Sequence, residues 1–144
     1  MISTLYKATS LLLLLPTLAF GAIGEVTDYS GSGAVERDEG FEVYEVTDGL
    51  GVESMDVVVT EKGKVRIDFI DDTRVDITEH SRLIIDDFVY DPASGEGSLS
   101  LKAGLGTIRY ASGKIAKNSR QRVRIETPSA VVGVRGTDFA MIVD

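Results

Sequence analysis

One stretch near the end of the chain decides the fold: Thr127-Pro128-Ser129-Ala130-Val131-Val132-Gly133-Val134-Arg135-Gly136-Thr137-Asp138-Phe139. It places two glycines and one arginine inside a run of residues that otherwise favour a β-strand. Glycine weakens the interior of a strand, so Gly133 and Gly136 indicate a bulge or a close approach of two backbones. Thr127-Pro128 marks the start of the strand, where proline removes no hydrogen bond from the sheet.

Arg135 allows two interpretations. Its guanidinium can donate to backbone carbonyls or to a buried carboxylate and so hold the last strand in place. Alternatively, it can bind an anionic partner. Because the neighbouring valines and Phe139 read as core residues, we predict a structural role for the whole stretch. Its members are Thr127, Pro128, Gly133, Arg135, Gly136, Thr137 and Phe139.

The chain before this stretch shows the two-residue period of β-strands. Apolar residues alternate with polar ones at 65–69 and again at 75–77, on either side of the acidic pair Asp71-Asp72. Two such runs joined by a short turn predict a β-hairpin with one buried face. The β-branched run at 57–60 predicts a further strand, which we expect to end in a turn at 61–63.

Strand signals continue at 83–85 and 88–90, with Asp86-Asp87 as a turn or bulge between them, and residues 91–97 read as a loop. The best helical candidate, residues 112–122, reads equally well as a loop. Turn signals recur about every 8–12 residues, as in sandwiches and barrels. We therefore predict an all-β fold, an antiparallel sandwich or β-roll, as one domain over residues 22–144 that could continue beyond Asp144 in a longer chain.

The terminal stretch resembles the signature TP-x-A-x-x-GVRGT-x-F, which closes the periplasmic FecR-type domain. Gly24-Glu25-Val26, Val35-Glu36-Arg37 and the strand pattern that begins at Asp56 are similar to other segments of that family. The resemblance implies a periplasmic β module that contacts the signalling domain of an outer-membrane receptor. In the iron-uptake regulators a membrane helix joins it to a cytoplasmic sigma-factor regulator. Only six residues precede Lys7, so we do not expect that half in this chain.

The N-terminus indicates export from the cytoplasm. Lys7 precedes an apolar run at 11–15, and the small residues Ala19 and Gly21 fit a signal-peptidase cut after Gly21. We predict that residues 1–21 are a cleaved signal peptide. The mature protein then has no integral membrane segment and is periplasmic or extracellular. The alternative is a retained anchor, but the apolar stretch is about 16 residues long, shorter than the roughly 20 that a spanning helix needs.

The charge distribution is uneven along the mature chain. Residues 22–96 contain 20 acids and 6 bases, whereas residues 97–144 contain 3 acids and 8 bases. One interpretation is that the two parts attract each other within one fold. The other is a basic face for an anionic partner, formed by Lys102, Arg109, Lys114, Lys117, Arg120, Arg122 and Arg124. We predict a protein partner and no nucleic acid, because the net charge is −8 and aromatic residues do not alternate with the bases.

Few residues suit catalysis or metal binding. His80 is the single histidine and the chain has no cysteine, so a catalytic triad, a zinc site and a disulfide are not expected. We predict no catalytic residue, no cofactor and no enzyme activity. Asp71, Asp72, Asp86 and Asp87 are weak candidates for a calcium site, because paired carboxylates at turns supply oxygen ligands. They lack the spacing of a calcium-binding loop.

We therefore expect a non-catalytic, secreted or periplasmic interaction module with a role in envelope sensing or signalling. The alternative is a structural or assembly component of a surface or virion-associated complex. The sequence leaves the oligomeric state and the identity of the partner open.

The signal-peptide prediction is tested by N-terminal sequencing of protein recovered from outside the cytoplasm. We expect the first residue to be Ala22. Recovery of an intact Met1 in the membrane fraction would show a retained anchor instead.

Overall fold

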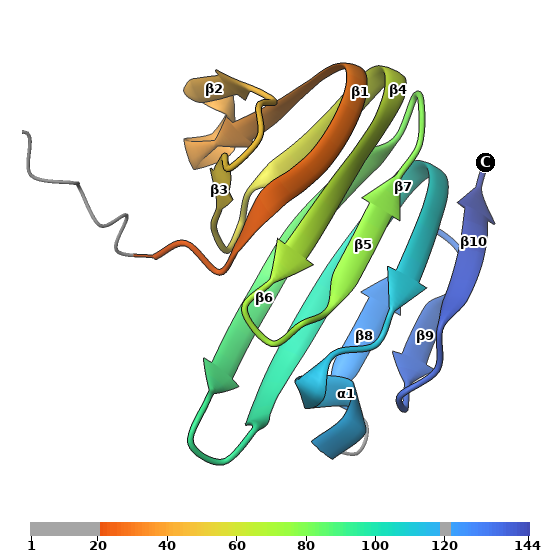
Figure 1. Cartoon of the computed structure of the whole chain (residues 1–144). Helices are drawn as coiled ribbons and strands as arrows, with labels where there is room; N and C mark the ends of the chain where they lie inside the picture. Colours follow the sequence, from red (N-terminus) through yellow and green to blue (C-terminus); the bar gives the residue numbers. More distant parts are fainter. Residues whose placement is uncertain (1–20, 119–121) are drawn as a thin grey trace, which may run out of the picture.

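The computed structural model describes residues 21–118 and 122–144; the predicted signal peptide, 1–21, lies outside this part apart from Gly21. The described residues form a ten-stranded sheet with the order β2-β1-β4-β5-β7-β8-β9 along its main path (Figure 1). Strands β3, β6 and β10 pair off this path. No helix among the described residues has the length and apolar character to cross a membrane.

In chain order the elements are β1 (Gly24–Arg37), the 3-10 helix η1 (Asp38–Gly40), β2 (Glu42–Glu45), β3 (Gly51–Val52), β4 (Val57–Phe69), β5 (Arg74–Ile77), β6 (Arg82–Asp91), β7 (Glu96–Ala111), α1 (Lys114–Asn118), β8 (Val123–Glu126), β9 (Val131–Val134) and β10 (Phe139–Val143).

Three long strands, β1, β4 and β7, each belong to two halves of the sheet. Half A comprises β2, the end of β1, the start of β4, β6, the first part of β7, β8 and β9. Half B comprises β3, the start of β1, the end of β4, β5, the last part of β7 and β10. The sheet folds back on itself between the halves, and Phe69 of half B stacks on Phe88 of half A with 5.5 Å between ring centroids. The fold is therefore a sandwich made from one bent sheet.

Glycines lie where the long strands bend. Gly31 of β1 is paired with Gly63 of β4, with φ angles of +75° and +92°. A Cβ atom on Gly31 would run into the backbone carbonyl of Lys62, and one on Gly63 would run into that of Ser30. In β7, Gly106 has a φ of +99°, and a Cβ atom there would overlap the side chain of Ser81. The bend therefore requires glycine both for space and for backbone conformation.

Thr60 connects the bend of β4 to the segment between β5 and β6. Its hydroxyl donates to the carbonyl of Thr78 and accepts a 3.0 Å bond from the N–H of Ser81. Its own N–H donates to the carbonyl of Ser81 at 3.0 Å. Residues 78–81 pass from half B to half A next to the bend of β4. The bonds to Thr60 therefore hold this segment against β4 where the two are not paired as strands.

The interior between the halves is apolar. Half B contributes Val65, Ile67, Val75, Ile77 and Ile108, and half A contributes Val58, Leu83, Ile85, Leu99, Leu101, Val123 and Ile125. All of these side chains are nearly or completely inaccessible to solvent. Burial of their apolar surface supplies the main free energy that holds the two halves together.

Two segments cross the end of the sandwich that lies opposite the bend. Helix α1 leads from β7 in half B towards β8 in half A, and 135–138 lead from β9 back to β10 (Figure 1). Asp71 is fully buried here. Its carboxylate accepts bonds from the N–H and hydroxyl of Thr73 at 3.1 and 2.8 Å and from the N–H of Ile115 at 3.2 Å. Asp71 thus joins the β4–β5 turn to the start of α1.

The structure confirms the all-β fold and the hairpin of 65–69 with 75–77, which is β4 with β5. It also confirms the bulge at Asp86-Asp87, where the register of β6 against β7 shifts. The predicted turn at 61–63 is wrong: β4 continues through it, because the bend at Gly63 keeps its pairing with β1. The best helical candidate, 112–122, contains the short helix α1. Strands β7 and β8 pair in parallel, which departs from the predicted antiparallel arrangement.

The bend is tested by Gly63→Ala. We expect it to lower the free energy of unfolding by at least about 2 kcal/mol, because the methyl group meets the opposite backbone and the φ angle is unfavourable for alanine. Gly133→Ala is the control, since nothing lies within 4 Å of a Cβ atom there. Denaturant midpoints measure both, and equal midpoints would contradict the requirement for glycine at the bend.

Candidate interaction edges

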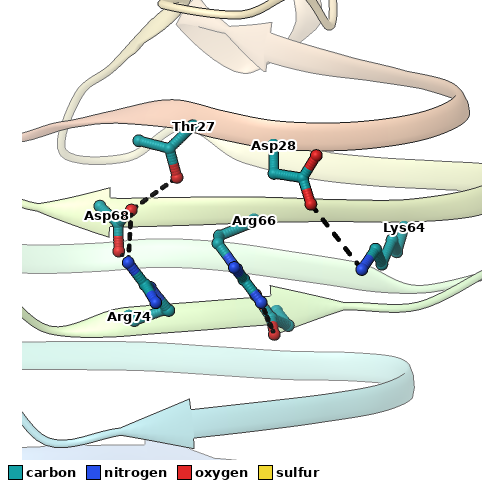
Figure 2. Close-up of polar contacts among 7 residues, drawn as sticks. Thr27, Asp28, Lys64, Arg66, Asp68 and Arg74 are labelled. Atoms are coloured by element: carbon teal, nitrogen blue, oxygen red, sulfur yellow. Dashed lines mark hydrogen bonds and ion pairs between the residues drawn. The ribbon is translucent and has the colours of Figure 1, made fainter.

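The outer face of half B is a ladder of paired charges, as Figure 2 shows. Arg66 donates two bonds to Asp76 at 2.7 and 3.0 Å, and Arg74 donates two to Asp68 at 2.7 and 3.3 Å. At its margin, Lys64 lies 3.8 Å from Asp28. Partial burial acts to raise the pKa of Asp68, but bonds from Arg74 and Thr27 outweigh it and hold that pKa below its usual value. The charges of this face are satisfied by one another, which marks it as a solvated surface.

A buried ion pair closes the β1 side of the sandwich. Arg37 donates to both carboxylate oxygens of Asp56, at 2.9 and 2.8 Å, and to the carbonyl of Gly51 at 3.2 Å. Asp56 is fully buried and also accepts a 2.8 Å bond from the N–H of Glu53. The hydrogen bonds with Asp56 raise the pKa of the Arg37 guanidinium further above its usual value. This pair joins β1 of half A to the chain that returns from β3 of half B.

The first part of the terminal signature forms the turn between β8 and β9. The hydroxyl of Thr127 accepts bonds from the N–H groups of Ser129 and Ala130, and its own N–H donates to the carbonyl of Ala130 at 2.8 Å. Pro128 sits in this turn, where its missing N–H removes no bond from the sheet. Thr127-Pro128 thus precedes β9 as predicted.

The last part of the signature crosses the open end of the sandwich. The N–H of Ser112 donates to Asp138 at 2.8 Å, and its hydroxyl donates to the carbonyl of Thr137 at 2.9 Å. Phe139 packs against Tyr110 with 5.3 Å between ring centroids. Gly136 has a φ of +73°, which glycine adopts without strain. These contacts hold β10 in place.

The structure does not support the predicted structural role of Arg135. Its side chain is exposed and forms no hydrogen bond or ion pair with another described residue. The reason is its position: Arg135 follows β9 on the same outward face as Val131 and Gly133, whereas Val134 points into the core. Asp138 and Thr137 perform the anchoring that we assigned to Arg135.

Strand β9 is a free edge of half A. It pairs with β8 on one side and with no described strand on the other. An open groove of about 510 Å³ lies along it, lined by Val123, Arg124, Val131, Gly133, Arg135 and Thr137. Val131 is 62% exposed, and Gly133 leaves open space above the strand. Arg124 donates a 2.7 Å bond to Glu126, whereas the guanidinium of Arg135 has no partner among the described residues. An apolar free edge beside this guanidinium is a surface that suits an extended segment with acidic residues.

The other predicted basic residues do not form one face. Lys102 lies 3.3 Å from Asp86, and Lys114 lies 3.3 Å from Asp72. Arg109 is exposed on β7, and Lys117 is exposed on α1. Arg122 and Arg124 are exposed beside β9, Arg124 donates a 2.7 Å bond to Glu126, and Arg120 lies outside the described residues. The interpretation that basic and acidic parts of the chain pair within the fold therefore holds for Lys102 and Lys114.

The weak metal candidates are separated by the fold. Asp71 is buried and bonded to backbone groups, Asp72 is exposed at the β4–β5 turn, and Asp86 and Asp87 lie on β6 in the other half. Within the described residues no group of three or more histidine, cysteine or acidic side chains could hold a metal ion. His80 is exposed at the bend, with a φ of +52°.

The fold and its terminal signature define an all-β module, and comparison with known proteins gives its family. The model of the family described as FecR protein matches residues 55–144. Because this range is more than half of the chain, the protein belongs to the FecR protein family, which indicates a signalling or sensing module. Comparison with curated proteins found no match, and comparison with solved structures found none.

The sequence did not predict two polar pairs that join distant segments, Arg37 with Asp56 and Ser112 with Asp138. Arg37 and Asp56 were each recognised as parts of family-like segments, but their pairing spans 19 residues and depends on the return of the chain through β3. Asp138 lies inside the signature, yet its partner Ser112 is 26 residues away. The one signal for Asp56 in the sequence is its position, a carboxylate directly before the β-branched run at 57–60.

The ion pair is tested by Arg37→Ala, with Arg74→Ala as the matched control. We expect Arg37→Ala to lower the free energy of unfolding by about 3–5 kcal/mol, because it leaves the buried Asp56 carboxylate without its partner. Arg74→Ala removes an exposed partner of Asp68 and should cost about 1 kcal/mol or less. Denaturant midpoints decide, and comparable losses in the two variants would contradict the special weight of the buried pair.

Proposed function

We propose that this FecR-family protein is an exported, non-catalytic interaction module whose β9 edge binds an acidic extended segment of a partner protein. The observation that carries the proposal is the exposed Arg135 in the terminal signature. It stands beside a free strand edge and has no partner among the described residues.

The composition of β9 supports binding at this edge. Its sequence, Val131-Val132-Gly133-Val134, carries no charge that would oppose pairing with another strand, whereas edge strands are commonly protected by charges or proline. Arg135 follows it and supplies attraction for carboxylates, whereas Arg124 on the neighbouring strand already donates a 2.7 Å bond to Glu126. Backbone hydrogen bonds then give affinity, and Arg135 selects an acidic partner.

The non-catalytic part of the proposal is supported by how the carboxylates are used. Asp56, Asp68, Asp71 and Asp76 accept hydrogen bonds from arginines or from backbone groups, so they stabilise the fold. Export is supported by the leader-like sequence of residues 1–21.

The experiment is site-specific photocrosslinking from the β9 edge. The photoreactive residue p-benzoylphenylalanine replaces Val131 in the full chain, expressed with its own N-terminus in the cells that make it. We expect a discrete adduct in the exported fraction and its loss in a second variant that also carries Arg135→Glu. Arg135→Glu alone should shift the free energy of unfolding by about 0.5 kcal/mol or less, because the side chain is exposed.

The control carries the same photoreactive residue at Val89, which is exposed on β6 away from the edge. It should give no adduct. Absence of an adduct from position 131, or an adduct unaffected by Arg135→Glu, would contradict the proposal.

A further inference from the structure

The opposite edge of half A is also free. Strand β2 pairs with β1 and with no second described strand, and all four of its residues are exposed. Val43 is 63% exposed, and Phe41 next to the strand is the most exposed large apolar residue of those described. An exposed apolar strand at a sheet edge is a template for pairing with another chain.

The charge at this edge is opposite to that at β9. Exposed acids surround β2: Asp38 and Glu39 in the turn before it, and Glu42 and Glu45 within it. Two arginines lie nearby: Arg37 is bonded to Asp56, and Arg82, which lines a groove together with Asp38 and Glu39, lies 3.7 Å from Glu36. The β2 edge is thus apolar and acidic, and the β9 edge is apolar and basic.

The two edges are the ends of one row of residues across the outer face of half A. The register pairs Val43 with Glu36, Glu36 with Val57, Val57 with Ile84, Ile84 with Lys102, Lys102 with Glu126 and Glu126 with Val131. The row therefore begins and ends with a valine of nearly equal exposure, 63% and 62%. A second copy set beside the first would continue the row with Val131 against Val43.

The strand directions allow this contact. Successive neighbours from β2 to β9 are antiparallel except for β7 and β8, so β9 runs opposite to β2 across the half-sheet. A copy added in the same orientation therefore places its β9 antiparallel to β2 of the first. With Val131 opposite Val43, Arg135 comes towards the acidic turn at Asp38 and Glu39.

We infer that copies of this protein associate head to tail, with β9 of one copy added to the free edge of β2 of the next. The inference rests on the proposed function, because it uses the same β9 edge and names its partner as a second copy. Each copy keeps one edge of each kind free, so the contact extends into an open chain or closes into a ring.

The charges also disfavour contact between two β2 edges. Two antiparallel β2 strands would bring Glu42 of one copy towards Glu45 of the other. Like charges opposite each other across a strand pair are unfavourable. Attraction at the head-to-tail contact and repulsion between two β2 edges favour the head-to-tail contact.

The experiment uses exported protein with one edge blocked at a time, measured by analytical ultracentrifugation. Val43→Glu replaces the apolar partner of Val131 with a charge, which prevents pairing of the two edge strands. The double change Val131→Glu and Arg135→Glu turns the basic edge acidic. We expect the parent protein to exceed the monomer mass about two-fold or more at about 1 mM, in the range of weak complexes. Each blocked variant should remain monomeric.

Mixing the two blocked variants gives the sharpest result. The Val43→Glu variant still has an intact β9, and the other variant still has an intact β2, so together they should form a 1:1 dimer. This dimer cannot extend, because its remaining edges both carry glutamate. Roughly 1 M salt should weaken the complex, since the screening length falls to about 3 Å.

Ile142→Glu is the matched control, because Ile142 is 76% exposed on β10, the free edge of half B. It should associate as the parent does. A parent protein that stays monomeric at about 1 mM, or a mixture of blocked variants that forms no dimer, overturns the inference. If crosslinks from position 131 to a different protein persist in that case, the proposed function stands and only the second copy fails as its partner.

Discussion

The close passage of two backbones at Gly31 and Gly63 is the constraint on which the rest of the structure depends. At this pair the two strands approach so closely that neither position has room for a Cβ atom. Both residues also adopt positive φ angles, which let β1 and β4 change direction without losing their pairing. With Gly106 making the same bend in β7, one sheet supplies both layers of the sandwich, and a single apolar core forms between them.

Once the sheet is bent, its margins need to be closed, and buried or short-range polar contacts do this. Arg37 and Asp56 close the β1 side, where the chain crosses from β3 back to β4. At the end opposite the bend, Asp71 accepts a bond from the N–H of Ile115 in α1, and Asp138 accepts one from the N–H of Ser112. The carboxylates of Asp56, Asp71 and Asp138 all accept hydrogen bonds from groups distant in sequence. They therefore stabilise the fold only after the halves have met.

The family match and the free edges divide the chain in an informative way. Residues 55–144, which match the FecR family model, contain β9 and the signature with its exposed arginine. Strand β2, with its acidic and apolar edge, lies before this range. The basic edge therefore belongs to the family-matched part, whereas the acidic edge lies before it. The proposed self-association would join the two functions that the sequence left open, sensing and assembly.

The sequence by itself determined the strand content, the β4–β5 hairpin, the bulge in β6 and the family, because alternation of apolar and polar residues and a local motif are properties of adjacent residues. Tertiary structure alone decided that β4 runs through 61–63, since the bend depends on the opposite glycine of β1. It also decided that Arg135 is exposed while Asp138 anchors the signature. Whether a side chain faces solvent or a carboxylate depends on which strands become neighbours. The alternation of residues along one strand does not specify which distant segment pairs with it.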